Sequence, residues 1–105
     1  MTKITYTRYP KATLKAEGHC MADRINDRDL CCAAVSMLVC TFMKRIDELK
    51  VKDKFVYMAN GFAKGGFCSK GKSGRAGLEA LDTVLAGFRL LKEKYPDNIT
   101  IQGGK

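Results

Sequence analysis

Two residues in the first third of the chain are of the types that together perform covalent cysteine catalysis. His19 is the only histidine among the 105 residues, and Cys32 follows a short loop later. A thiolate attacks electrophilic carbon, and a nearby imidazole serves as general base and then as general acid. The two side chains would therefore form a nucleophile and its base.

A helix that begins near Asp29 is expected to position this cysteine. Aspartate is a favoured N-cap, and the run from Leu30 onward is strongly apolar. Cys32 would then be the third helical residue, where the helix terminus favours a thiolate and unpaired N–H groups could hold an oxyanion. The alternative reading of the same spacing is that His19 is a surface loop residue and Cys32 a thiol of the helix core.

The rest of the chain predicts one domain, residues 1–105, of the α+β class. Apolar alternation indicates strands, and leucines at spacings of three and four indicate a second helix that Pro96 ends. This order favours a two-layer sandwich, with two helices packed on a mainly antiparallel sheet. The expected elements are strands at 2–8 and 12–18, an exposed loop at 20–28, a helix from 29 to about 50, a strand at 54–59, a short strand at 65–68 within the glycine-rich segment 60–77, a helix at 76–95 and a strand at 99–101.

The residues around the histidine and the cysteine resemble the ribosomal-processing cysteine protease family known as Prp. That family shows Gly-His-Ala, a glycine-containing loop and then Asp-x-x-Cys-Ala-(Ala/Gly)-x-Ser. Gly18-His19 and Asp29-Leu30-Cys31-Cys32-Ala33-Ala34-Val35-Ser36 follow this pattern. Lys94-Tyr95-Pro96-Asp97 is similar to the family's C-terminal Tyr-Pro-Asp, so the resemblance covers nearly the whole chain.

The resemblance implies a role for each residue of the block. His19 is the general base and Cys32, rather than the adjacent Cys31, is the nucleophile, because the family's Asp and Ser frame that position. Asp29 and Ser36 are supporting residues, and Asp29 is expected to cap the helix, to orient His19, or to do both. The loop between His19 and Cys32 is expected to clamp the substrate, which places Asp23, Asn26 and Asp27 in a substrate loop.

The resemblance also implies the partners. Family members remove an N-terminal extension from a large-subunit ribosomal protein, phage relatives are thought to process capsid or scaffold proteins, and the family forms homodimers. This chain departs from the pattern in having Cys20 after the histidine, a His–Cys loop longer by one residue, Asp27 in place of a loop glycine, and a strongly basic segment at 50–75. The loop geometry and the usual substrate are the features that these departures affect.

The cysteine count argues against disulfide, zinc and redox functions. Five cysteines cannot all pair within one chain, and there is no C-x-x-C. We therefore expect no metal and no cofactor, and we rank a thiol-sensing role for the adjacent Cys31 and Cys32 lowest. The chain has no signal-peptide core and no apolar run of membrane-spanning length, which predicts a cytoplasmic protein without membrane contact.

The charge points to a second kind of partner. The formal net charge is +8, and residues 50–75 hold seven basic residues against one acidic residue. A non-catalytic module that binds rRNA or the ribosome through Lys70, Lys72 and Arg75 is the alternative function. Residues 66–73 also match the phosphate-binding P-loop pattern, but too little chain follows Ser73 for the parallel sheet that such an enzyme needs.

Overall fold

Seven strands and two helices make up the part of the chain that the structure, a computed structural model, describes. The described residues are 1–18, 24–25 and 28–104. The elements in chain order are β1 (Thr2–Thr7), β2 (Lys11–Gly18), β3 (Arg24–Ile25), β4 (Arg28–Asp29), α1 (Leu30–Glu48), β5 (Phe55–Ala59), β6 (Phe62–Cys68), α2 (Gly71–Lys94) and β7 (Ile99–Gly103).

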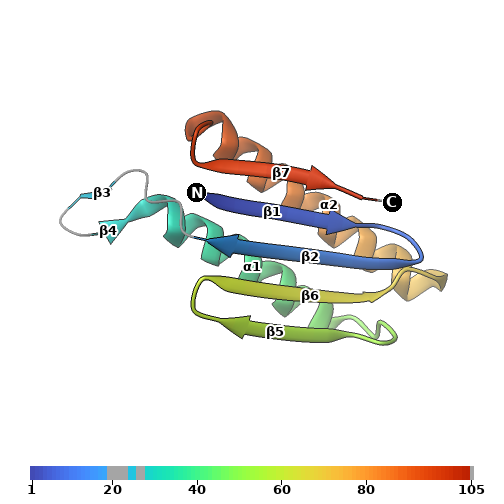
Figure 1. The fold of residues 1–105 in the computed structure, drawn as a ribbon. Helices are drawn as coiled ribbons and strands as arrows, with labels where there is room; N and C mark the ends of the chain where they lie inside the picture. Colours follow the sequence, from blue (N-terminus) through green and yellow to red (C-terminus); the bar gives the residue numbers. More distant parts are fainter. Residues whose placement is uncertain (19–23, 26–27, 105) are drawn as a thin grey trace.

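The main sheet has the strand order β5-β6-β2-β1-β7, and both helices lie side by side on one of its faces (Figure 1). Three neighbouring pairs are antiparallel, and only β1 and β7 run parallel. The predicted fold class, two helices on a mainly antiparallel sheet, is confirmed. A mainly antiparallel sheet is also incompatible with the P-loop interpretation, because Ser73 lies in the first turn of α2 and no parallel nucleotide-binding sheet is formed.

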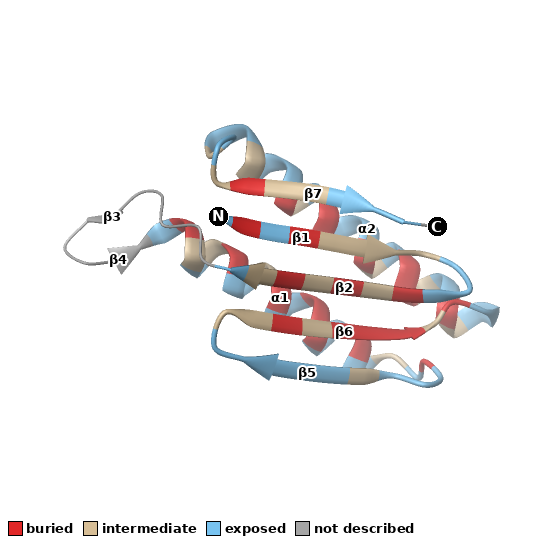
Figure 2. Ribbon diagram, viewed as in Figure 1, coloured by how far each residue is buried: buried red, intermediate tan, exposed pale blue. Residues whose placement is uncertain are grey.

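The core lies between the sheet and the helices. Burial alternates along β1 and β2, so every second side chain points toward the helices, and each helix buries the stripe that faces the sheet (Figure 2). Phe42 of α1 packs against Phe67 of β6, with ring centroids 6.3 Å apart. The largest side chains of this core, all almost fully buried, are Phe42, Phe67, Phe88, Ile4, Leu14, Ile46, Leu81 and Ile99.

The boundaries of three predicted elements were wrong. The second helix begins at Gly71, not near residue 76, and β6 spans seven residues, so most of the glycine-rich segment is regular structure. Close packing explains both differences, since the side chain of Met43 lies against Gly65 and Ser69 lies against Gly74. The segment expected to be an exposed loop also contains the paired short strands β3 and β4.

Candidate active site

The two adjacent cysteines at the start of α1 have different surroundings. Cys31 is fully buried and belongs to the hydrophobic core, whereas Cys32 is only partly buried and borders a pocket. Helix α1 begins at Leu30, so Cys32 is its third residue and lies in the turn whose backbone N–H groups lack intrahelical partners. Only one of the two thiols can therefore meet a molecule bound in the pocket.

The pocket has a volume of about 350 Å³ and lies where α1 begins, where β2 ends and where β5 turns into β6. These three places come together at one end of the sheet (Figure 1). Most of the lining is apolar, which suits an apolar side chain of a ligand better than a charged one. The lining residues are Thr2, Ala16, Gly18, Cys32, Ala33, Val35, Ser36, Val39, Met58, Ala59, Asn60, Gly61, Phe62 and Ala63.

Gly18 fixes the geometry of the pocket rim. Its φ of 90° lies in the region that favours glycine, and a Cβ at this position would collide with the carbonyl oxygen of Met1. Its N–H donates a hydrogen bond of 2.8 Å to the carbonyl oxygen of Gly61. This bond holds the β5–β6 turn against the end of β2, so glycine at residue 18 keeps two walls of the pocket together.

The site residues expected from the sequence fall into two groups. Cys32 and Ser36 lie one turn apart on α1, and both line the pocket. The backbone of Asp29 ends β4 directly before the first residue of α1, which is the N-cap position. The expected base and the expected substrate loop, His19, Asp23, Asn26 and Asp27, lie outside the described residues.

Sequence reasoning missed the wall of the pocket that the β5–β6 turn provides. The segment that contains Met58, Asn60 and Phe62 carries no catalytic pattern. These residues line the same pocket as Cys32 only because β6 pairs with β2. No local signal in the sequence could have identified them. Strand pairing between segments far apart in the chain was needed to bring them to the start of α1.

The basic residues of the expected RNA-binding surface lie away from this pocket. Lys70, Lys72 and Arg75 are exposed and surround the start of α2, at the opposite end of the sheet (Figure 1). The structure therefore does not combine them with Cys32 into one site.

Two further classes of site find no support in the part of the chain that the structure describes. Among residues 1–18, 24–25 and 28–104, no group of three or more histidine, cysteine, aspartate or glutamate side chains could hold a metal ion. Within the same residues, no helix is both long enough and apolar enough to cross a membrane. The pocket beside Cys32 is thus the feature on which a functional assignment depends.

Comparison with known proteins decides the family. Residues 1–100 match the family described as cysteine protease Prp. The chain belongs to the Prp family. The class of enzyme expected from the sequence, a cysteine protease that hydrolyses peptide bonds, is thereby confirmed. A comparison with curated proteins found no match.

Solved structures of other proteins share the fold of this chain. The essential ribosomal processing protease Prp from Staphylococcus aureus, with a covalently linked product peptide, has a TM-score of 0.80 at 17% identity, and the likeness covers 99% of this chain and 100% of that chain. The same protease with a substrate peptide has a TM-score of 0.77 at 16% identity, with the same coverage. SMU.848 from Streptococcus mutans has a TM-score of 0.71 at 19% identity, covering 98% of this chain and 93% of that chain.

Proposed function

We propose that this Prp-family protein removes an N-terminal extension from a large-subunit ribosomal protein, with Cys32 as nucleophile and His19 as general base. The observation that carries the proposal is the contrast between the two neighbouring thiols: Cys32 borders the pocket, whereas Cys31 is sealed in the core. The Staphylococcus aureus relative is a ribosomal processing protease that has been crystallised with substrate and product peptides, which supports a peptide substrate here.

The proposed reaction proceeds through an acyl-enzyme. His19 takes the proton of the Cys32 thiol, and the sulfur attacks the carbonyl carbon of the scissile bond. Backbone N–H groups in the first turn of α1 stabilise the oxyanion, and His19 then protonates the departing amine. Water hydrolyses the thioester, returning the thiol and releasing the acid. Asp29 and Ser36 support this pair, and the loop with Asp23, Asn26 and Asp27 closes over the peptide.

The shape of the pocket supports an apolar side chain next to the scissile bond. Val35 and Val39 of α1 and Met58 of β5 line it, and none of its lining residues carries a charge that could bind a polar residue. Burying one such side chain would stabilise the complex by about 1.5–3 kcal/mol. We therefore propose that the substrate places a large apolar or aromatic residue in this pocket.

A paired substitution of the neighbouring cysteines tests the nucleophile. The variant Cys32→Ala is expected to abolish cleavage of the ribosomal precursor, whereas Cys31→Ala is expected to retain cleavage and to lower the free energy of unfolding, because it leaves a small cavity in the core. Cleavage is followed by electrophoresis and mass spectrometry of the new N-terminus. Unchanged cleavage by Cys32→Ala would refute the proposal.

Thiol labelling tests the role of His19 separately from the substrate. Iodoacetamide is expected to modify Cys32 faster than Cys40, which is exposed on the same helix and serves as the internal control. His19→Gln should slow the labelling of Cys32 and leave that of Cys40 unchanged, as measured by peptide mass spectrometry over time. Equal slowing of both thiols would indicate a loss of folding rather than of the base.

The same assays separate the other functions. A capsid or scaffold substrate would show as cleavage of a phage structural protein but not of the ribosomal precursor. A non-catalytic module would bind RNA through Lys70, Lys72 and Arg75 and would be indifferent to Cys32→Ala. We further propose a cytoplasmic homodimer, which light scattering of the purified protein would reveal as twice the mass of 11.6 kDa.

A further inference from the structure

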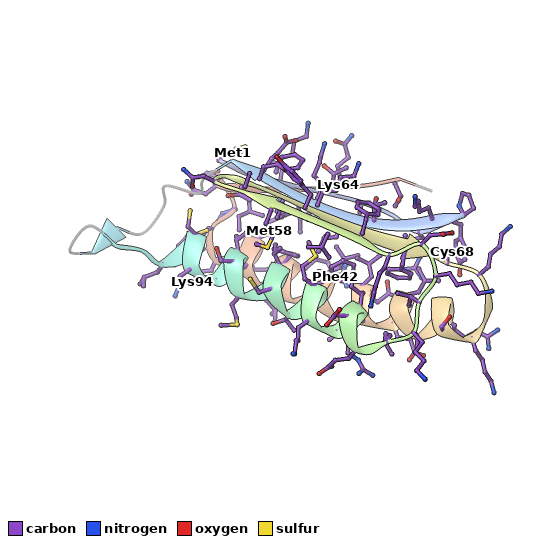
Figure 3. All side chains as sticks on the ribbon, turned by 90° about the horizontal axis from the view of Figure 1, so that it is seen from below. Met1, Phe42, Met58, Lys64, Cys68 and Lys94 are labelled. Carbon is purple, nitrogen blue, oxygen red and sulfur yellow. The ribbon has the colours of Figure 1, made fainter. Side chains whose placement is uncertain are left out.

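One face of the main sheet is not covered by either helix. In Figure 3, Phe42 and Met58 lie between the sheet and the helices, whereas Lys64 projects from the opposite side. The pocket beside Cys32 opens on the helix side, since α1 forms one of its walls. The uncovered face is thus a second surface, separate from the pocket beside Cys32.

The strand register places five side chains in a straight line across this face. Tyr57 is opposite Lys64, Lys64 is opposite Lys15, Lys15 is opposite Thr5, and Thr5 is opposite Gln102. Neighbouring strands lie about 4.8 Å apart, so the line spans about 19 Å. We name these five residues the cross-sheet row.

The centre of the cross-sheet row holds two cations that repel each other. Lys15 and Lys64 stand directly opposite on antiparallel strands, an arrangement that destabilises a sheet. Glu17 lies 3.5 Å from Lys15, but Lys64 forms no ion pair with any acidic side chain among the described residues. An anion placed between the two lysines would relieve this repulsion.

The fourth residue of the cross-sheet row, Thr5, has a buried side-chain hydroxyl. The side-chain oxygen of Thr5 is buried and has no hydrogen-bond partner within the described part of the chain. Because this oxygen is buried, a molecule lying on the face cannot reach it. The exposed side chain of Gln102, the next residue of the row, supplies an uncharged hydrogen-bonding group instead.

An exposed aromatic ring completes the row at the edge of the sheet. Tyr57 is 60% exposed, and Phe62 supports it from the side, with ring centroids 5.8 Å apart and an angle of 68° between the rings. An exposed ring beside lysines is the combination on which proteins stack the bases of single strands while holding their phosphates. Lys3 and Lys11 add positive charge at the margins of the same face.

We propose that the cross-sheet row binds single-stranded nucleic acid, with a phosphate between Lys15 and Lys64 and a base stacked on Tyr57. Gln102 then contacts the sugar or the edge of a second base. A second copy of this chain fits poorly, because a two-fold contact would bring lysines against lysines. A duplex fits poorly as well, since its bases are stacked on one another and cannot lie on the ring.

Fluorescence anisotropy with labelled oligouridylate and oligothymidylate of about 12 nucleotides tests the proposal. The double variant Lys15→Gln/Lys64→Gln is expected to weaken binding by about tenfold and to lower the steepness of the salt dependence by about 0.7, the value for one lost phosphate contact on a single strand. Tyr57→Leu should weaken binding by about tenfold without changing the salt dependence. The RNA and DNA arms show whether the 2′-hydroxyl is recognised.

The matched control is Lys70→Gln/Lys72→Gln, which removes the same charge from the start of α2. Its affinity should stay within about twofold of the unmodified protein, because these lysines lie off the sheet face. Equal weakening by both double variants, or unchanged binding by Lys15→Gln/Lys64→Gln, would overturn the proposal. So would a change in the mass of the assembly in the sheet-face variant, which would show that a second copy occupies this face.

Discussion

The two helices of this protein begin at opposite ends of the sheet, and their first turns differ in what surrounds them. The first turn of α1 carries Cys32 and borders a largely apolar pocket closed by the end of β2 and the β5–β6 turn. The first turn of α2 follows the P-loop-like glycine-rich segment and is surrounded by exposed lysines. Both termini have backbone N–H groups without intrahelical partners and carry partial positive charge. A helix terminus therefore becomes a candidate active site only where other elements enclose it.

Moving the thiol between the two termini is the most severe test of this comparison. Ser73 occupies the third position of α2, as Cys32 does in α1. The double variant Cys32→Ala/Ser73→Cys should cleave peptide at least about a thousandfold more slowly than the unmodified protein, because the new thiol has neither pocket nor base. Steady-state cleavage gives the rate, and iodoacetamide labelling verifies that the introduced thiol is accessible. Recovery of cleavage would show that the terminus alone suffices.

Substitution of two glycines with positive φ, one at each end of the sheet, compares the stability of the two ends. Gly18→Ala should lower the free energy of unfolding by about 3 kcal/mol, since backbone strain adds to a collision with Met1. Gly71→Ala at the start of α2 should cost about 1 kcal/mol, because a Cβ there meets open space. Urea denaturation measures both values. If both substitutions lowered the free energy of unfolding equally, the contact around Gly18 would not constrain the pocket rim.

Removing the ion pair between α2 and the residue that follows β1 should lower the free energy of unfolding by a smaller amount. Arg8 donates a hydrogen bond to Asp82, and this bond, more than any other factor, raises the pKa of the guanidinium. Because the folded-state pKa is raised, the contribution is fully present at neutral pH and is lost as the pH rises through the raised pKa of Arg8. The partners are largely exposed, so Asp82→Asn should cost at most about 1 kcal/mol in thermal unfolding at neutral pH. A larger loss would indicate that water is excluded from the pair.

Neutralising the lysines at the start of α2 should change cleavage and stability less than any of the substitutions above. Lys70→Gln/Lys72→Gln is expected to leave cleavage within about twofold and stability within about 0.5 kcal/mol, because both side chains are exposed and distant from Cys32. A peptide-cleavage assay and a denaturation curve measure the two quantities. A tenfold loss of cleavage would instead connect the two ends of the molecule functionally.

Most elements of the fold could be predicted from local patterns, and the exceptions have a common cause. Alternation identified the strands, and the leucine stripe identified the body of α2. The start of α2 was missed because Gly71 and Gly74 have poor helix propensity, and only close packing against Ser69 makes the helix begin there. The length of β6 was missed for the same reason, since its glycines are places where Met43 and Phe55 approach the backbone.

The spacing along the chain is visible in the amino-acid sequence alone: a cysteine three residues after an aspartate at a helix start, and a serine one turn later. Those relations depend only on helix geometry, which is local. The three-dimensional fold was needed to show that Cys31 is buried whereas Cys32 borders a pocket, which Gly61 also lines. It was needed as well to show that Lys15 and Lys64 lie opposite each other on the uncovered face. These relations depend on the register between strands distant in sequence, and the local pattern does not specify which strands pair.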